Sequence, residues 1–394
     1  MKKEYIIPIF VPHLGCPNDC TFCNQKSISG EQKMITTEDI KKTIDFFLEN
    51  VKEKDAYKEV AFFGGSFTGI EYEKQEEFLK TAYDYIKEKK INSIRISTRP
   101  DYIDKKILKL LKKYKVKTIE LGVQSSNDYI LKKINRGHTF NDVKKASKMI
   151  RMHGFKLGHQ MMVGLPESTK IDDINTAKSL IKLKPKMVRI YPVLIIKGTQ
   201  LEKDYNNGEY EPLSVVQAVE TCKELVAMFN KKNIEVIRIG LQTTDEICDP
   251  NNGTSEVVAG PYHPAFRQLV ESGLWYDSIV AKIKKLNVKV KEVQVTVNPI
   301  DVNNVIGHKK ENAIKLKELY DVDLIVEQDE GLKQGKSKIE VTKTYEDWNL
   351  GAKTFRDTYQ KFKKWLITVL NLGKLRRKGN RRKQWKKKQI LNKW

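Results

Sequence analysis

The stretch Cys16-Pro17-Asn18-Asp19-Cys20-Thr21-Phe22-Cys23 places three cysteines on one short loop, directly after the apolar run Tyr5–Val11, which predicts a first strand. Three thiolates at this spacing can bind three irons of a cubic iron–sulfur cluster, which leaves the fourth iron without a protein ligand. An open metal position is what catalysis requires, whereas a structural metal site is closed. The alternative is a structural zinc site with His13 as the fourth ligand.

The composition and the cysteine count narrow the class of protein. The chain has 394 residues, which allows two or three domains, and 40% hydrophobic with 31% charged residues is typical of a globular protein. Five cysteines, three of them in the motif, argue against a secreted disulfide framework. No segment approaches the roughly 20 apolar residues of a membrane span, and Pro8 and Pro12 interrupt the N-terminal apolar run, unlike a signal peptide. We therefore expect a cytoplasmic protein without a membrane partner.

Up to about residue 245, short β-like runs alternate with longer helical patterns. Strands are expected over Tyr5–Val11, Glu59–Phe63, Ile94–Thr98, Thr118–Gln124, Leu157–Val163, Met187–Ile196 and Glu235–Ile239. Helices are expected over Thr37–Val51, Tyr72–Lys89, Lys105–Tyr114, Asp128–Ile134, Asn141–His153, Ile171–Leu183 and Ser214–Asn230. Parallel strands joined by crossover helices predict an α/β fold, a partial or complete parallel β/α barrel whose chemistry lies at the carboxyl ends of its strands.

Two further segments follow the expected barrel, 1–245. Residues 246–345 combine a strand pattern over Val288–Val297, a helical pattern over Asn312–Leu319 and a short strand over Asp323–Val326, which predicts a small C-terminal α+β appendage. Residues 346–394 form a basic tail with four of the five tryptophans. Three interpretations of the tail stay open: a grip on tRNA phosphates, a disordered solvated extension, or the product of a frameshift.

The charge balance suits a polyanionic partner. Lys and Arg number 73 against 50 Asp and Glu, a net charge of +23. The last 23 residues contain eleven Lys or Arg and no acidic residue, so the rest of the chain still carries +12. A basic body of this kind is compatible with RNA binding, although charge alone does not prove it.

Further motifs stand where the expected strands end. Gly64-Gly65-Ser66-Phe67-Thr68-Gly69 follows the second strand, and Ser97-Thr98-Arg99-Pro100-Asp101-Tyr102 follows the third. Together with the cysteine motif and with Glu120–Ser125 and His159–Pro166, they resemble the radical S-adenosylmethionine (SAM) domain of the Elongator catalytic subunit and its bacterial relatives, over about residues 5–245. The segment Val257–Glu271 resembles the appendage of a bacterial branch of that group.

The resemblance implies a set of cofactor ligands. Cys16, Cys20 and Cys23 would hold a [4Fe-4S] cluster, and SAM would chelate its open iron. Phe22 would pack near the adenine, where an aromatic ring suits a base. The glycine motif, continued by Ser66, would meet the SAM amino group through exposed backbone, since Gly64 and Gly65 have no Cβ to block the approach.

Other residues at strand ends receive broader expectations. Ser97, Arg99 and Gln124 would contact the SAM carboxylate, the ribose or the substrate. Arg136 and His138 stay open between a ligand role and a structural role, and His159 between core and cavity. The resemblance implies radical chemistry that needs no general base, so no catalytic residue is assigned.

The resemblance also implies a mechanism. A low-potential donor of the flavodoxin or ferredoxin type would supply the electron that cleaves SAM to methionine and a 5′-deoxyadenosyl radical, which abstracts hydrogen from an unactivated carbon. The Elongator-like motifs favour a base of tRNA or another RNA as the substrate. Two alternatives stay open: a small molecule such as a tetrapyrrole, and a non-catalytic metal-binding protein. We find no acetyl-CoA site after residue 246, so the acetyltransferase domain of the Elongator subunit is not expected.

Overall fold

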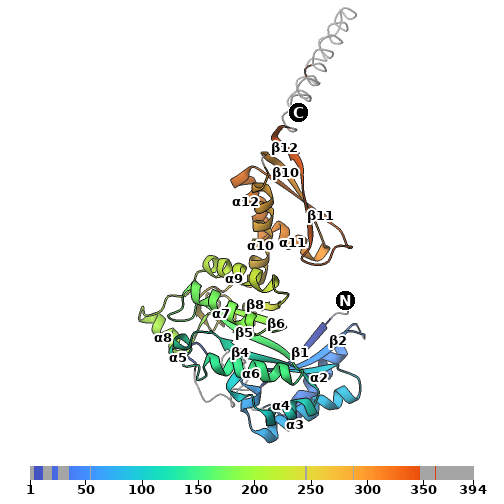
Figure 1. Cartoon of the computed structure of the whole chain (residues 1–394), viewed down its shortest axis with the longest axis vertical. Helices are drawn as coiled ribbons and strands as arrows, with labels where there is room; N and C mark the ends of the chain where they lie inside the picture. The colour runs from blue at the N-terminus through green and yellow to red at the C-terminus, as the bar shows by residue number, and fades with distance from the viewer. Residues whose placement is uncertain are drawn as a thin grey trace, which may run out of the picture. The chain divides into compact units, whose positions relative to one another are not determined.

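The structure is a computed structural model that describes residues 4–11, 20–24, 35–53, 55–244, 246–286, 288–346 and 360. The chain forms two compact units, Met1–Leu274 and Trp275–Trp394. In Figure 1 the described part of the first unit runs from blue to yellow and that of the second is orange. The division into 1–245, 246–345 and 346–394 stays a prediction; residues 246–274 belong to the first unit here, and nearly all of the expected tail lies outside the described residues.

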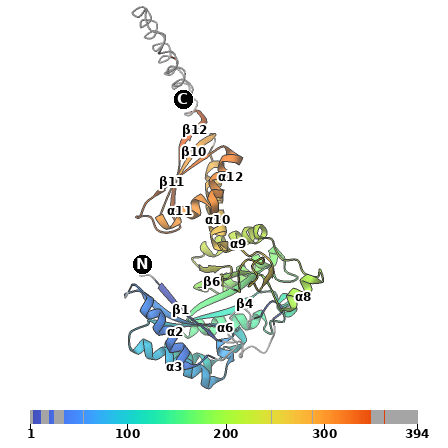
Figure 2. The same ribbon diagram turned by 180° about the vertical axis from the view of Figure 1, so that it is seen from behind.

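The first unit is built on a seven-stranded, fully parallel sheet, which confirms the expected α/β fold as a partial barrel. The strands stand in the order β1-β2-β3-β4-β5-β6-β8, and Figures 1 and 2 show the sheet curled into an open half-barrel with helices along its outside. The strands are β1 (Glu4–Val11), β2 (Tyr57–Gly64), β3 (Ser93–Thr98), β4 (Val116–Gln124), β5 (Lys156–Val163), β6 (Met187–Pro192) and β8 (Glu235–Ile239). All carboxyl ends therefore meet at one rim.

Helices follow the strands as the apolar spacing predicted. They are α2 (Thr37–Asn50), α3 (Tyr72–Lys87), α4 (Lys105–Lys113), α5 (Asp128–Lys133), α6 (Phe140–Met152), α7 (Lys170–Lys182), α8 (Gln200–Asn206) and α9 (Val215–Asn230). Several of them begin with a capping box, at Thr36, Thr139, Thr169 and Ser214. The side chain of each of these residues accepts from the backbone N–H three residues later, and the side chain of that later residue accepts from the backbone N–H of the capping residue. The sequence missed only α8 among these helices.

The strand expected over Met187–Ile196 is interrupted in the structure. β6 ends at Pro192, and Ile195–Ile196 forms a separate strand, β7, which pairs antiparallel with β9 (Val257–Ala259). Proline has no backbone N–H to continue a ladder, so the chain leaves the sheet there. The pairing ties residues 257–259 to the rim of the half-barrel.

The second unit is a three-stranded sheet packed against helices. β10 (Val290–Val297) is the central strand, parallel to β11 (Asp323–Gln328) and antiparallel to β12 (Ser337–Thr344). Two helices, α11 (Val302–Ile306) and α12 (Glu311–Tyr320), join β10 to β11, and the C-terminal half of α10 (Phe266–Lys284) contributes to the same core. This is the small α+β appendage expected from the sequence, with α10, α11 and β12 added. No helix in the described ranges has the length and apolar character to cross a membrane.

Side chains of the large sheet alternate between the helix-covered face and the inside of the half-barrel. Ile94 and Ile96 of β3, for example, belong to the apolar core shared with the helices. The residues that alternate with them on β3, Ser93, Arg95 and Ser97, are buried and polar. Four side chains from β2, β3, β4 and β6 form what we call the interior ion cluster: Glu59, Arg95, Glu120 and Arg189.

Glu120 lies at the centre of the interior ion cluster. Its Oε1 accepts from Arg95 Nη1 at 2.8 Å and from Arg189 Nη2 at 3.1 Å, while Arg95 Nε donates to Glu59 at 2.6 Å. Burial alone raises the pKa of Glu120, but the guanidinium groups of Arg189 and Arg95 outweigh burial and hold this pKa below its usual value. Two carboxylates therefore balance two guanidinium groups inside the barrel.

His159 lies in the core and not in the cavity of the barrel. It is buried on β5, and its Nε2 lies 2.9 Å from Oγ of Ser147 on α6. Burial lowers the pKa of His159 to about 3, so the ring is neutral in the folded protein at physiological pH.

Removing the central carboxylate of the ion cluster tests its contribution to stability. Glu120→Ala leaves two buried guanidinium groups without their shared partner, and we expect the free energy of unfolding to fall by about 3–5 kcal/mol. The control Glu77→Ala breaks an exposed pair with Lys74 and should lower it by less than about 1 kcal/mol. Urea unfolding at pH 7 measures both, and equal losses in the two variants would contradict the assignment.

The neutral state of His159 predicts a pH dependence. The unfolded chain protonates this ring at a pKa of about 6.5, whereas the folded protein does so only near pH 3. The unfolded state thus binds the extra proton, and stability falls as the pH decreases from 6.5. Between pH 7 and pH 5 we expect wild type to lose about 2 kcal/mol relative to His159→Gln in urea unfolding. A difference in unfolding free energy between wild type and His159→Gln that stays constant with pH would exclude His159 as the titrating group. The control is His153→Gln, at an exposed helix end.

Candidate active site

A cavity of about 540 Å³, counting the part open to solvent, lies at the rim where β1 to β4 end. The cavity is lined by Cys20, Phe22, Cys23, Gly64, Gly65, Ser66, Ser97, Thr98, Gly122, Gln124, Arg136 and Gln160. The structure thus brings together two of the three predicted cysteines and six of the seven residues predicted to bind a cofactor.

The described part of the cysteine loop, residues 20–24, is a tight turn fixed to its surroundings. The backbone N–H of Cys23 donates to the carbonyl of Cys20 at 3.0 Å, so both side chains project from one turn. Thr21 is held on both sides, because its N–H donates to Ile134 and its carbonyl accepts from Leu201. Phe22 packs in a small apolar cluster with α5 and α8. Cys16 and His13 lie outside the described residues.

The glycine turn after β2 forms the adjacent wall. Gly64 has φ +97°, a region that favours glycine, and a Cβ there would lie 2.6 Å from the carbonyl oxygen of Val11. The N–H of Gly65 donates to the same carbonyl at 2.9 Å. The ends of β1 and β2 are therefore in direct contact, and the turn presents bare backbone to the cavity.

Gln124 ends β4 in a strained conformation. Its φ is +71°, and the pairing of β4 with β5 shifts register between Gly122 and Gln124. A non-glycine residue in this region costs on the order of 1–3 kcal/mol and persists only where its surroundings impose it. Its Oε1 is buried and accepts no hydrogen bond within the described structure. The cavity wall therefore contains a hydrogen-bond acceptor that a ligand can use.

Arg136 lies just after α5, and its side chain lines the cavity. Nη2 donates to the carbonyl of Gly122 at 2.8 Å, and Nη1 lies 3.6 Å from Sγ of Cys20. A Cβ on Gly122 would lie 2.5 Å from Nη2, so the glycine makes room for the arginine. A fixed positive charge beside the sulfur can offset the negative charge of a thiolate, and Nε of Arg136 is a further buried donor without a partner in the described residues.

These features fit an anionic iron–sulfur cluster with a polar ligand beside it. The sulfurs of Cys20 and Cys23 are soft ligands for iron, and Arg136 supplies compensating charge. The unpaired acceptor of Gln124, and Gly64 with no Cβ to block a close approach, suit a ligand that carries amino and hydroxyl groups.

Comparison with known proteins gives the family. Residues 10–180 match the model of the radical SAM superfamily, and residues 185–276 match that of the radical SAM C-terminal domain. The chain belongs to the radical SAM superfamily. It is a radical SAM enzyme, and membership implies a [4Fe-4S] cluster and SAM as cofactors.

The relatives confirm the resemblance to the Elongator catalytic subunit. An uncharacterized protein of Methanocaldococcus jannaschii is 33% identical over 228 residues, which are 55% of this chain and 70% of the relative. The tRNA uridine(34) acetyltransferase of Methanocaldococcus infernus is 32% identical over 193 residues, 44% of this chain but 36% of the relative. The structure of Elp3 from that organism, lacking an N-terminal segment, shares the fold with a TM-score of 0.55, 22% identity and coverage of 72% and 64%.

The predicted contact Arg99, and His138, whose role the sequence left open, lie apart from the cavity lining of this radical SAM enzyme. Arg99 is fully buried and forms a two-pronged ion pair with Asp101, while its guanidinium lies over the ring of Tyr102. His138 is buried behind β4, with Nε2 3.3 Å from the carbonyl of Val123. Burial, with the nearby charge of Arg136, lowers the pKa of His138 to about 3.

The sequence missed three cavity residues: Thr98, Gly122 and Gln160. Gln160 reaches both the cavity and the ion cluster, since its Nε2 lies 3.4 Å from Glu120 and from Ser97. Strand alternation was the signal available, because Glu120, Gly122 and Gln124 point to the same side of β4.

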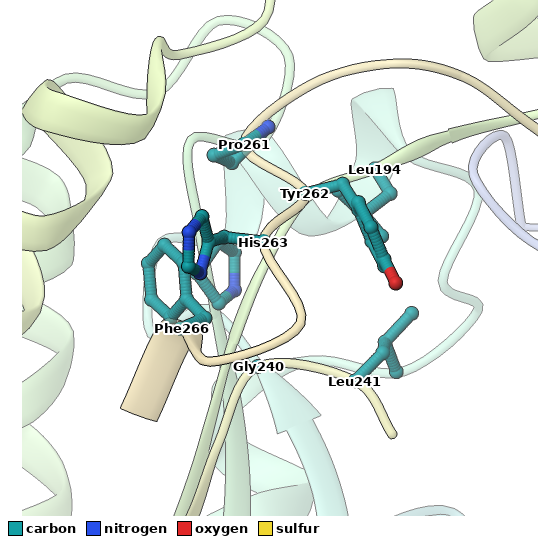
Figure 3. Close-up of a pocket in the computed structure, with 8 residues that line it drawn as sticks. Leu194, Gly240, Leu241, Pro261, Tyr262, His263 and Phe266 are labelled. Carbon is teal, nitrogen blue, oxygen red and sulfur yellow. The ribbon is translucent and has the colours of Figure 1, made fainter. Parts of the chain in front are cut away.

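A second pocket lies at the ends of β6 and β8 on the same rim (Figure 3). Pro261, Tyr262 and His263 form one wall, with the ring of His263 beside Phe266 and the ring of Tyr262 directed towards Leu241. The N–H of Ala265 donates to Nδ1 of His263 at 3.0 Å, so a neutral ring carries its proton on Nε2.

The crowded turn at Gly64 predicts that no larger residue fits there. In Gly64→Ala the new Cβ meets Val11 and the positive φ is unfavourable, so we expect the apo chain to lose about 1–3 kcal/mol of stability. The distorted turn should also weaken SAM binding at least 10-fold, measured by equilibrium dialysis after anaerobic reconstitution. Gly253→Ala, where a Cβ meets nothing within 4 Å, is the control. Wild-type SAM affinity in Gly64→Ala would contradict the assigned contact.

Proposed function

We propose that this radical SAM enzyme holds its [4Fe-4S] cluster through Cys16, Cys20 and Cys23, binds SAM in the cavity beside them, and modifies a base of tRNA. The observation that carries the proposal is the cavity itself. It places two cysteine sulfurs, a compensating guanidinium and unsatisfied polar atoms around one space at the rim of the half-barrel.

Each wall of the cavity has a part in the proposed binding. The bare backbone at Gly64, Gly65 and Ser66 receives the SAM amino group, and Phe22 packs near the adenine. The Ser97 hydroxyl can donate to the carboxylate or the ribose of SAM, and the Gln124 amide oxygen can accept from a ribose hydroxyl. Arg99 directly follows the lining residue Thr98 and is paired with Asp101.

When bound, the cluster and SAM supply a 5′-deoxyadenosyl radical that abstracts hydrogen from the substrate. The residues of this chain position SAM, keep water from the cavity and balance its charge. A reductant of the flavodoxin or ferredoxin type supplies the electron. The chemistry requires no side chain to carry a proton, so none is assigned a role in catalysis.

Two observations favour tRNA as the substrate. Several of the relatives that match the radical SAM part are named tRNA uridine(34) acetyltransferases. The chain is strongly basic. The match covers 36% of the archaeal relatives, so the acetyl transfer in their name is not proposed here.

The cleavage of SAM tests the proposal. We expect wild type, reconstituted anaerobically with iron and sulfide, to form 5′-deoxyadenosine from SAM and dithionite, measured by liquid chromatography. Cys20→Ala should lose a cluster ligand and reduce the product to background. Cys222→Ala, in the core of α9, should keep both iron and product.

Two results would overturn the proposal. A wild-type protein that binds zinc instead of iron and forms no product would exclude the cluster. A protein could also cleave SAM without acting on tRNA. If added tRNA neither raises the yield of 5′-deoxyadenosine nor contains a modified nucleoside after hydrolysis, tRNA is excluded as the substrate class.

A further inference from the structure

We propose that the second unit binds single-stranded RNA through Gly307-His308-Lys309-Lys310, the turn that joins α11 to α12, here called the basic turn. The choice of RNA over DNA rests on the proposed function of the first unit. The binding itself rests on the fold and charge of the second unit alone.

The order of elements around the basic turn is the first argument. β10 leads into α11, the turn, α12 and then β11, and both helices pack on β11, which is an edge strand of the sheet. Strand, helix, tight turn, helix and strand is the arrangement of KH modules. In those modules a G-x-x-G turn between the helices clamps the backbone of about four nucleotides. Gly307 stands at the first position of such a turn, and Lys310 at the fourth.

The backbone of the basic turn has positive φ angles, which favour glycine, at Gly307, Lys309 and Lys310. Gly307 has φ +89°, and a Cβ there would lie 2.7 Å from the backbone nitrogen of Asn312. Lys310 has φ +64° and Lys309 φ +51°. Each left-handed lysine costs roughly 1–2 kcal/mol. Two lysines therefore occupy a strained turn where glycine would be more stable.

Asn312 holds the turn in this form. Its side chain is buried, and Nδ2 donates to the carbonyls of Asn304 at 3.3 Å and Val305 at 3.1 Å. These bonds tie the start of α12 to the end of α11. The turn is thereby pre-organised, which lowers the entropy lost when a ligand binds.

The charges of the turn match a phosphate backbone. Lys309 and Lys310 are exposed and form no ion pair with any residue in the described ranges. Lysines further along α12 differ: Lys315 pairs with Glu311, and Lys317 with Asp321 and Asp323. The two positive charges at the turn are therefore available to two successive phosphates.

A second RNA contact on the same chain would raise the affinity for a tRNA bound by the first unit. Linking two binding sites makes the second event intramolecular, so modest affinity at the turn adds to the total. Single-stranded loops and ends of a tRNA provide the unstacked nucleotides that such a turn binds.

Salt-dependent binding by the reconstituted full chain tests the inference. The probe is a fluorescent 12-nucleotide oligouridine, followed by anisotropy from 0.05 to 0.4 M KCl, without SAM or reductant. The variant Lys309→Gln/Lys310→Gln should lose two phosphate contacts. The slope of log K against log salt concentration should then become shallower by about 1.4, and binding should weaken about 25-fold at 0.1 M salt. Lys282→Gln/Lys285→Gln removes two exposed lysines elsewhere in the unit and should bind like wild type.

A second variant separates loss of binding from loss of folding. Lys310→Gly removes one charge but relieves the left-handed strain, so it should raise the thermal stability while weakening oligouridine about 5-fold at 0.1 M salt.

Three results would overturn the inference. The double variant of the turn could keep the wild-type affinity for oligouridine and its salt dependence, or the control variant could lose as much affinity as the double variant. A blunt RNA duplex or single-stranded DNA could also bind as tightly as oligouridine. Because the assay contains no SAM, its failure is independent of the 5′-deoxyadenosine test.

Discussion

The carboxylate of Glu120, shared by two buried guanidinium groups, is the interaction on which the arrangement of the first unit depends. An open half-barrel cannot fill its interior with helices, so the inward side chains must satisfy one another. Arg95 and Arg189 reach Glu120 from strands on either side, and Glu59 completes the charge balance. The cluster also supports the cavity floor, because Gln160 contacts both Glu120 and the cavity. A buried network of this kind specifies one register of the strands, since a shift by one residue would bury unpaired charge.

The site above this floor follows from the parallel sheet. Every strand ends at the same rim, so residues 20–24 and the turns after β2 and β4 meet although they are far apart in sequence. The residues at this rim are closely packed and leave little room for larger side chains. Gly64 leaves no room for a Cβ against β1, Gly122 leaves room only for Arg136, and Gln124 keeps a strained φ. The turns therefore have little freedom to move, which suits a cavity that must hold a reactive ligand and exclude water.

The two units divide the proposed work. The first forms a cavity at the rim of its half-barrel, and its family is that of radical SAM enzymes. The second carries an exposed basic turn held in a fixed shape. Enzymes that modify large nucleic acids need both a small site for the base and a broader contact with the backbone. The chain offers a candidate for each.

Much of this protein could be predicted from the sequence alone. Periodicity placed the strands and helices of the first unit within a few residues, because apolar spacing reports which face of each element is buried. The cysteine spacing and the glycine motif indicated the family and the rim on which its site would lie, since both follow strand ends. The tertiary structure decided the rest. It placed Arg136 beside Cys20 and buried Arg99 in an ion pair with Asp101, formed the ion cluster from four separate strands, and left His159 in the core. It also ended β6 at Pro192 and put Lys309 and Lys310 at one exposed turn. These features depend on distances between residues that are remote in sequence, and local pattern carries no information on such distances.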